Sequence, residues 1–274
     1  LAYAQMRGWT TVRTGDLRQP MRLSADQERK LFSRLARAKM IARVWRGLYL
    51  VPPRLPLGGA WTPDEGLALA ALMAARGGRY QICGLNAFNR YGFDEQMPNR
   101  VYAYNNRLSG ERSIGSVQLT LIKVADARLG ATEEVACWDG GPPAVYSSRA
   151  RALVDAVYDW SRFGTLPRGY RWIRNELRAK RVKASELVDL TLRFGDKGTI
   201  RRIGALLEKE GIAEALLRRL ERAVPSTSSP IPWIPRRAKR GPVARRWGVV
   251  WNGEVWACRS AATKRAGGEA EGLG

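Results

Sequence analysis

The chain has 274 residues, a length that favours two domains, and its composition of 45% apolar and 26% charged residues is that of an ordinary globular protein. Its 47 Lys and Arg against 25 Asp and Glu leave a net charge of +22, which favours a polyanionic partner: nucleic acid first, and an anionic membrane surface second. There is no histidine, which excludes Ser-His-Asp, Cys-His and His-metal chemistry.

The compartment follows from three further features. The longest apolar run, Leu67–Ala75, is far shorter than the roughly 20 residues of a spanning helix, and the first residues do not form a secretory signal. Cys83, Cys137 and Cys258 lack CxxC spacing, which argues against a disulfide framework and a cysteine zinc site. The initial Leu indicates either truncation or a non-standard bacterial start codon. We expect a bacterial, cytoplasmic, nucleoid-associated protein with no membrane contact.

Residues 1–53 begin with two short predicted helices. The first ends at Gly8, a residue typical of a helix stop. The second opens at Thr14, with Asp16 in its first turn, and Pro20 prevents it from continuing far.

A longer helix is predicted over Ser24–Lys39. Ser24 and Gln27 have the spacing of a capping box. One face gathers the apolar residues Leu31, Leu35 and Ala38, with Phe32 at its edge. The opposite face is cationic and hydrogen-bonding, and it comprises Asp26, Arg29, Lys30, Ser33 and Arg37.

Two β-prone runs follow, residues 41–45 and 48–51, and the Arg46-Gly47 turn between them predicts a hairpin with Arg43 and Arg46 at its tip. Helix, short helix, cationic helix and hairpin predict a winged helix-turn-helix domain over 1–53. Its recognition helix would enter the major groove and its wing would lie along the backbone or the minor groove. The alternative is that the cationic face is only a solvated helix surface.

The DNA-binding residues predicted in this domain fall into two groups. Those in the first half of the helix are placed to read bases: Ser24, Asp26, Arg29, Lys30 and Ser33. The remaining ones, Arg34, Arg37, Arg43 and Arg46, would contact phosphates.

Residues 60–224 predict a mixed α+β domain. A helix opens at Thr62–Glu65 and stops at Gly77-Gly78, and a short strand and helix follow over 80–91. Strands are expected over 100–104, 115–123, 135–138 and 144–146, and helices over 148–160, 170–180, 185–193, 199–210 and 212–224. Strands followed by helices, without βαβ alternation, indicate the α+β class.

Residues 225–262 combine a proline-rich basic segment with a C-terminal hairpin. Four prolines in 225–235 oppose regular structure, a hairpin is predicted over 247–256 with its turn at Asn252-Gly253, and 263–274 are expected to be disordered. Between the proline-rich stretch and the predicted hairpin lie six cations that we predict to bind DNA, flanked by Trp233 and Trp247. They are Arg236, Arg237, Lys239, Arg240, Arg245 and Arg246. A protein partner and a flexible solvated arm are the alternatives for this segment. Arg201 and Arg202 are a further candidate contact for nucleic acid or a partner, with simple solvation as the alternative.

Catalytic signals are weak. Asp94, Glu95, Lys123 and Asp126 would be the residues of a Mg²⁺-dependent nuclease, but Leu121 occupies the strand position where an acid should stand. Asp155 and Asp159 share a helix face, where solvation or local pairing with Arg151 or Arg162 is the simpler interpretation. Nucleotide-binding glycine motifs are absent. We expect no catalytic residue, metal or cofactor; a metal-dependent nuclease or a nucleoprotein-assembly module is the alternative.

Four segments, in order, resemble one family. Residues 32–53, FSRLARAKMIARVWRGLYLVPP, resemble the winged-helix segment of AbiEi antitoxins, with RGLYLVPP the most specific piece. The segments YSSRARALVDAV (146–157), TIRRIGALL (199–207) and ARRWGVVWNG (244–253) resemble later parts of the same family. The terminal tail and the basic, proline-rich insert near residue 230 depart from the family pattern.

The resemblance implies an antitoxin of a type IV, abortive-infection toxin–antitoxin system. Such a protein would bind an inverted-repeat operator in double-stranded DNA, repress its own operon, and counteract a cognate nucleotidyltransferase-like toxin through the antitoxin-type domain 60–224.

Overall fold

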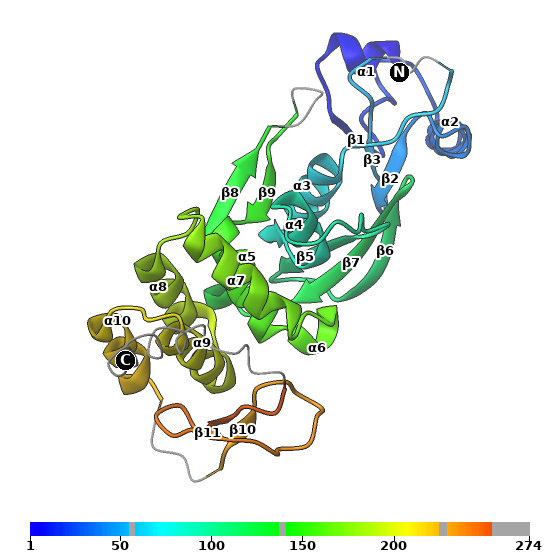
Figure 1. Cartoon of the computed structure of the whole chain (residues 1–274). Helices are drawn as coiled ribbons and strands as arrows, with labels where there is room; N and C mark the ends of the chain where they lie inside the picture. The colour runs from blue at the N-terminus through cyan, green and yellow to red at the C-terminus, as the bar shows by residue number, and fades with distance from the viewer. Residues whose placement is uncertain (55–57, 137–140, 225–228, 254–274) are drawn as a thin grey trace, which may run out of the picture. The chain divides into compact units, whose positions relative to one another are not determined.

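The computed structural model describes residues 1–54, 58–136, 141–224 and 229–253 (Figure 1). The chain divides into two compact units, Leu1–Thr199 and Ile200–Gly274. Helices and several sheets are mixed in it, so the predicted α+β class is confirmed. The division differs from the predicted domains, because residues 1–53 belong to the same unit as most of 60–224. No helix in the described ranges has the length and apolar character needed to cross a membrane.

The N-terminal segment contains two helices and a three-stranded antiparallel sheet of order β1-β3-β2. Its elements are α1 (Ala2–Met6), β1 (Thr11–Arg13), α2 (Ala25–Arg37), β2 (Ala42–Trp45) and β3 (Leu48–Leu50). The predicted hairpin is confirmed by the antiparallel pairing of β2 with β3. The predicted capping box is also confirmed, because the Ser24 hydroxyl accepts from the Gln27 amide and the Gln27 side chain accepts from the Ser24 amide.

The second helix predicted from Thr14 is wrong, because residues 14–22 form turns. The buried carboxylate of Glu28 organises them: it accepts hydrogen bonds from the backbone amides of Gly15 and Leu17 and from Nε of Arg18. Because the Glu28 carboxylate accepts their hydrogen bonds, these donors are satisfied without the carbonyl partners that a helix would provide. The winged helix-turn-helix assignment therefore stays a prediction.

The core of this segment differs in detail from the predicted apolar face. Phe32, predicted at the edge, is buried and stacks on Tyr49 of β3 at a ring-centroid distance of 4.7 Å. Ala38 is exposed, because α2 ends one residue before it. Leu31 and Leu35 are partly buried against the same cluster, as predicted.

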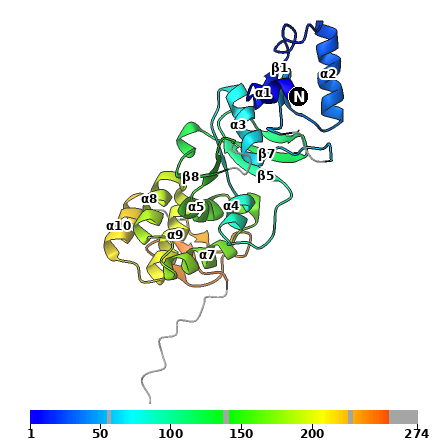
Figure 2. The same ribbon diagram turned by 90° about the horizontal axis from the view of Figure 1, so that it is seen from above.

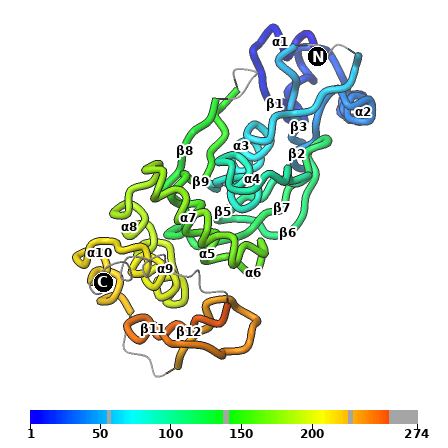
Figure 3. The backbone as a smooth tube through the Cα atoms, viewed as in Figure 1, coloured from blue at the N-terminus to red at the C-terminus, as the bar shows by residue number. Residues whose placement is uncertain are grey.

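A six-stranded mixed sheet of order β6-β7-β5-β4-β9-β8 forms the centre of the first unit, and its path can be followed in Figure 3. Its strands are β4 (Tyr80–Ile82), β5 (Val101–Asn105), β6 (Gly110–Ile114), β7 (Val117–Lys123), β8 (Thr132–Val135) and β9 (Ala144–Ser147). β5 runs parallel to β7 and β4 parallel to β9, while the other neighbours are antiparallel. A short 3-10 turn, η1 (Asp126–Arg128), follows β7.

Two of these strands correct the sequence prediction. The run expected over 115–123 is shorter, because Gly115 lies in the turn of a β6–β7 hairpin, and β6 was not predicted since its sequence GERSI is mostly polar and exposed. β8 begins three residues earlier than expected, and the predicted strand residues 137 and 138 lie outside the described residues.

Helices surround this sheet. They are α3 (Glu65–Arg76), α4 (Leu85–Arg90), α5 (Arg149–Tyr158), α6 (Trp160–Phe163), α7 (Arg168–Arg178) and α8 (Ala184–Phe194). α3 is capped by Asp64 rather than by the predicted Thr62, and it ends at Gly77 as predicted. α5 packs against α7 and α8 (Figure 2).

The second unit contains α9 (Lys197–Lys209), which begins three residues before the division, α10 (Glu214–Arg222) and a small sheet of order β10-β12-β11. The strands are β10 (Ile231–Pro232), β11 (Val243–Ala244) and β12 (Val249–Val250). The proline-rich segment thus contains a strand, contrary to prediction; β10 is an edge strand, where a proline without an N–H is tolerated.

β12 pairs with β11 across a turn at residues 245–248, and this hairpin was not predicted from the sequence. The second strand of the predicted C-terminal hairpin, 254–256, and the predicted disordered tail, 263–274, lie outside the described residues.

Candidate nucleic-acid interface

The exposed face of α2 carries the predicted cations. The side chains of Arg29 and Lys30 are 77% and 68% exposed, and Ser33, Arg34 and Arg37 are also exposed. At about 100° per residue, Lys30, Ser33, Arg34 and Arg37 lie opposite the buried Glu28 and Phe32. The core of the segment therefore fixes which side of α2 faces outward, and that side is cationic.

Asp26 and Ser24 have local roles in this face. Asp26 forms ion pairs with Arg29 and with Lys30, whose Nζ lies 3.0 Å from the carboxylate. These pairs are exposed and so contribute little stability, but they neutralise part of the positive charge near the start of α2. The Ser24 hydroxyl accepts from the Gln27 amide at 3.2 Å and is the cap of the helix. Arg34 and Arg37 lie beyond Asp26, in the last turns of α2.

The hairpin presents two more of the predicted cations. Arg43 is exposed in the middle of β2, opposite Tyr49 of β3, and not at the hairpin tip as predicted; Arg46 is exposed in the turn itself. Tyr49 stacks on Phe32 of α2. Since this ring pair joins the hairpin to the helix, the cations of both elements are held on one rigid scaffold.

The sequence prediction omitted other cations of the same segment. Arg13 is exposed at the end of β1 and Arg22 is exposed in the turns. Arg18 is half-exposed, and its Nε lies 3.1 Å from the Glu28 carboxylate. Residues 1–54 hold twelve Lys and Arg against three acids, and each acid is bonded within the segment, Asp16 through the Arg13 amide. The count of charges by segment is the signal that reveals the whole cationic surface.

The N-terminal segment is also held to the six-stranded sheet. The guanidinium groups of Arg76 in α3 and Arg112 in β6 lie 4.7 and 4.9 Å from the ring centroid of Trp45 in β2. The Ser116 hydroxyl donates to Thr62 at 2.9 Å nearby. Cation–π contacts of this kind stabilise the attachment of the hairpin to the rest of the first unit.

In the second unit, five of the six predicted cations are exposed: Arg236, Arg237, Lys239, Arg240 and Arg245. Arg246 is different. Its side chain is only 19% exposed, and its guanidinium lies 2.6 Å from Glu221, 2.9 Å from Glu214 and 3.4 Å from Glu208. The hydrogen bond to Glu214 raises the pKa of Arg246 above its ordinary value. Arg246 thus joins β12's turn to α9 and α10, and its prediction as a DNA contact is corrected.

Arg201 and Arg202 are corrected in the same way. Both are buried, and Arg201 donates from Nε to the Trp247 carbonyl at 2.6 Å and from Nη2 to the Ser229 carbonyl at 3.1 Å. Nε of Arg202 donates to the Pro232 carbonyl at 3.3 Å. Burial lowers the pKa of Arg201. These arginines hold the small sheet to α9 and are not surface contacts.

Other side chains of the chain form similar internal contacts. A Cβ on Gly204 would lie 2.3 Å from the Trp247 ring, so only glycine lets this indole reach α9. Nε1 of Trp247 donates to Glu208 at 3.0 Å. Arg151 and Asp155 form a local pair, as the sequence suggested, but both are fully buried rather than solvated.

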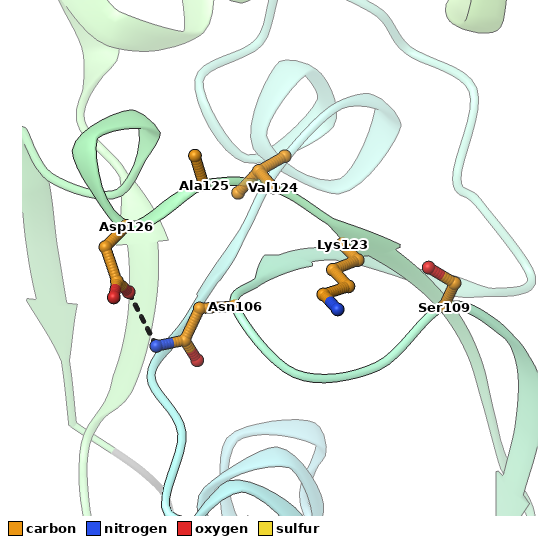
Figure 4. Close-up of a pocket in the computed structure, with 6 residues that line it drawn as sticks. All are labelled: Asn106, Ser109, Lys123, Val124, Ala125 and Asp126. Atoms are coloured by element: carbon orange, nitrogen blue, oxygen red, sulfur yellow. Dashed lines mark hydrogen bonds between the residues drawn. The ribbon is translucent and has the colours of Figure 1, made fainter.

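The nuclease residues do not form a metal site. Lys123 and Asp126 line an open pocket of about 560 Å³ with Asn106, Ser109, Val124 and Ala125 (Figure 4). Asp126 accepts from Asn106 at 2.6 Å, whereas Asp94 pairs with Arg168 at 2.9 Å. Within the described ranges, no three His, Cys, Asp or Glu side chains are placed to hold a metal ion together.

Comparison with known proteins gives the fold alone. No protein-family model matches the chain, and no curated protein matches it. The crystal structure of the RV2827C protein from Mycobacterium tuberculosis is similar: 90% of this chain aligns with 88% of that one at a TM-score of 0.55 and 17% sequence identity. The mixed α+β architecture described above is therefore shared with a solved structure.

Proposed function

We propose that this protein is a sequence-specific DNA-binding transcriptional regulator that uses α2 and the β2–β3 hairpin. The observation that carries the proposal is the two-sided α2, which buries Glu28 and Phe32 and exposes Arg29, Lys30, Arg34 and Arg37. A helix of this kind fits the major groove, and a neighbouring cationic hairpin fits the adjacent phosphate backbone.

The residues divide between two kinds of contact. Arg29, Lys30 and Ser33 are placed to donate to base edges, with Ser24 and Asp26 at the start of the helix. Arg34, Arg37, Arg43 and Arg46 would bind phosphates, which fix the register without reading the sequence. Every phosphate contact releases counterions, so affinity should fall steeply with salt concentration.

The test uses the full-length chain and duplexes that tile the DNA upstream of its own gene. Arg29→Ala and Lys30→Ala should each weaken binding to the preferred duplex by about 1–3 kcal/mol if the side chain reads a base. Arg171→Ala, which removes an exposed cation of α7, is the matched control and should bind normally. Unchanged binding in Arg29→Ala, Lys30→Ala and Arg37→Ala together would remove α2 from the interface.

We further propose that the regulator is an AbiEi-type antitoxin, cytoplasmic and nucleoid-associated, which represses its own operon from an inverted-repeat operator and counteracts a cognate nucleotidyltransferase-like toxin. Four ordered sequence matches, from residue 32 to residue 253, support this proposal. The test is co-expression with a nucleotidyltransferase-like reading frame from the same locus. Restored growth would support the antitoxin role, and continued toxicity despite expression of both proteins would contradict it.

A further inference from the structure

A cationic loop connects β10 to β11 in the second unit. Its residues 236–240 are Arg-Arg-Ala-Lys-Arg, and all five are exposed. No acidic residue occurs between residue 235 and residue 253. Like charges so close together repel one another unless an anion lies beside them.

The loop is anchored by the side chain of Asn252. The side-chain amide of Asn252 donates to the carbonyls of Ile234, Arg237 and Ala238 at 3.0, 3.3 and 3.1 Å. Its Oδ1 accepts from the Ile234 amide at 2.8 Å. One side chain therefore holds both the start and the middle of the loop.

The far end of the loop is fixed by a close backbone approach. Gly241 has a φ of +143°, and a Cβ there would lie 2.2 Å from the carbonyl oxygen of Trp251. Trp251 in turn packs on Trp233, with ring centroids 4.6 Å apart, and Lys209 lies 5.1 Å from its ring centroid. The cations thus project from a closed loop on an aromatic base.

The side chains in the loop differ from the other arginines of this unit. Arg201, Arg202 and Arg246 are occupied by carbonyls or carboxylates. Arg237, Lys239 and Arg240 are exposed and have no ion pair or side-chain hydrogen bond to any residue in the described part of the chain. These three charged side chains are therefore available to an anion outside the chain.

We propose that this Asn252-anchored loop is a second DNA site, which binds the phosphate backbone irrespective of sequence. The inference rests on the proposed function, in that it takes double-stranded DNA as the ligand. An acidic protein surface fits less well, because protein interfaces bury an apolar centre. Residues 236–241 contain four cations, one glycine and only one apolar side chain, that of an alanine. Regularly spaced phosphates need no such centre.

The test measures the affinity of the full-length protein for a random-sequence duplex over a series of salt concentrations. The triple variant Arg237→Gln/Lys239→Gln/Arg240→Gln should lower the slope of log affinity against log salt by about 0.9 for each phosphate that is no longer neutralised, or about 2 to 3 in all. The matched control Arg171→Gln/Lys180→Gln/Lys183→Gln removes three exposed cations from the α7–α8 region and should leave the slope nearly unchanged. Equal slopes for the two triple variants, or no change in the loop variant, would overturn the proposal.

Two further measurements separate this site from its alternatives. Asn252→Ala keeps every cation but removes the hydrogen bonds that anchor the loop. It should therefore weaken DNA binding while keeping the wild-type salt slope. Wild-type affinity in this variant would show that binding does not depend on the anchored conformation of the loop. Poly-glutamate should compete with the wild-type protein less well than DNA of equal charge, and equal competition would favour an acidic protein partner instead.

The proposal for the loop and the proposal for α2 can be tested independently. The loop variant should weaken operator and random duplexes by the same factor, so its preference for operator stays at the wild-type ratio. Variants of α2 should reduce that ratio. A loop effect without any operator preference would retain the backbone site and reject the proposed sequence-specific function, whereas the reverse pattern would reject the loop alone.

Discussion

Arg151 and Asp155, one helical turn apart in α5, lie where water does not reach them. Nε of Arg151 is 2.9 Å from Asp155, and its Nη atoms donate to the carbonyls of Arg128 and Gly130 at 3.0 and 3.2 Å. The Phe194 ring covers the guanidinium at 3.7 Å. A buried charge is tolerated when its hydrogen bonds are satisfied in this way.

The pair should be strongly coupled. Asp155→Ala leaves the Arg151 charge buried without its partner and should destabilise the first unit by about 3–5 kcal/mol, measured by urea unfolding. The double variant Arg151→Met/Asp155→Leu removes both charges and should cost clearly less than the single one. If the double variant costs as much as Asp155→Ala or more, the residues do not act as a pair.

At this scale the sequence predicts partners better than environments. The i, i+4 spacing suggested that Arg151 pairs with Asp155, which is confirmed, but it gave no sign that both are buried. Arg201, Arg202 and Arg246 show the same limit. A run of cations predicts a surface, whereas the carbonyls and carboxylates that bury these three come from segments distant in the sequence.

Among the elements, the turns at 14–22 depend on a side chain outside them. Glu28 is fully buried in α2 and binds the Gly15 and Leu17 amides. The local sequence, a Thr cap followed by an acid in the first turn, predicts a helix here. This local pattern does not include Glu28, so it cannot reveal the turns that Glu28 stabilises. The capping box at Ser24 and the hairpin after α2 were predicted correctly because both depend on neighbouring residues only.

Glu28→Ala should therefore release the turns. It leaves the buried Leu17 amide unsatisfied, at a cost of about 1–3 kcal/mol, and the more exposed Gly15 amide and Arg18 side chain also lose their acceptor. Together these losses should cost about 2–4 kcal/mol in urea unfolding. Glu28→Gln keeps one acceptor oxygen and should cost less. Asp26→Ala is the control on the exposed face and should be nearly neutral, and a comparable effect there would show that α2 tolerates no change in charge.

The junction of α10 with the β11–β12 turn should respond to acid. The hydrogen bond from Arg246 is the main reason that the pKa of Glu214 lies below its ordinary value of 4.5. A lowered carboxyl pKa stabilises the folded state above the unfolded pKa, and this stabilisation disappears as the pH falls through the folded value.

Unfolding of the second unit should accordingly become easier as the pH is lowered from about 6 to about 3, the range in which carboxylates titrate. In Glu214→Gln and in Arg246→Gln this pH dependence should be smaller, because each variant removes one partner of the Arg246–Glu214 hydrogen bond. The fluorescence of Trp247, obtained as the difference between each protein and its Trp247→Phe counterpart, reports the transition. The same pH dependence in all three proteins would contradict a role for the junction.

Across the whole molecule, the net charge of +22 works against compactness. The order of the predicted elements indicates the α+β class, and the net charge favours a polyanionic partner, both without any structure. Neither predicts the division at residue 199, because the contacts that join residues 1–53 to the six-stranded sheet, such as Arg76 and Arg112 on Trp45, are set by tertiary packing.

Salt should stabilise the free protein. Raising the ionic strength from about 0.1 M to about 1 M shortens the screening length from about 10 Å to about 3 Å and weakens the self-repulsion. The thermal midpoint in NaCl should rise over this range, and it should rise less in Arg171→Gln/Lys180→Gln/Lys183→Gln, which carries three fewer charges. A midpoint that falls with salt would mean that specific ion pairs outweigh the net charge.

Duplex DNA should stabilise the protein at low salt, whereas NaCl alone should stabilise it at high salt. A ligand at about 100 times its dissociation constant adds about 2.7 kcal/mol to the folded state, so the thermal midpoint should rise with DNA at low salt and lose this increment as binding weakens. DNA that leaves the midpoint unchanged at low salt would argue against binding to the folded chain.

The contact of Trp45 with two guanidinium groups has an optical consequence. Cations at 4.7 and 4.9 Å from the ring perturb the excited indole, so the emission of this residue differs from that of an indole in water. The chain has ten tryptophans, and the spectrum of Trp45 is obtained as the difference between the wild type and Trp45→Phe. This difference spectrum is a built-in reporter of whether the hairpin stays seated against the sheet while the protein is bound to DNA.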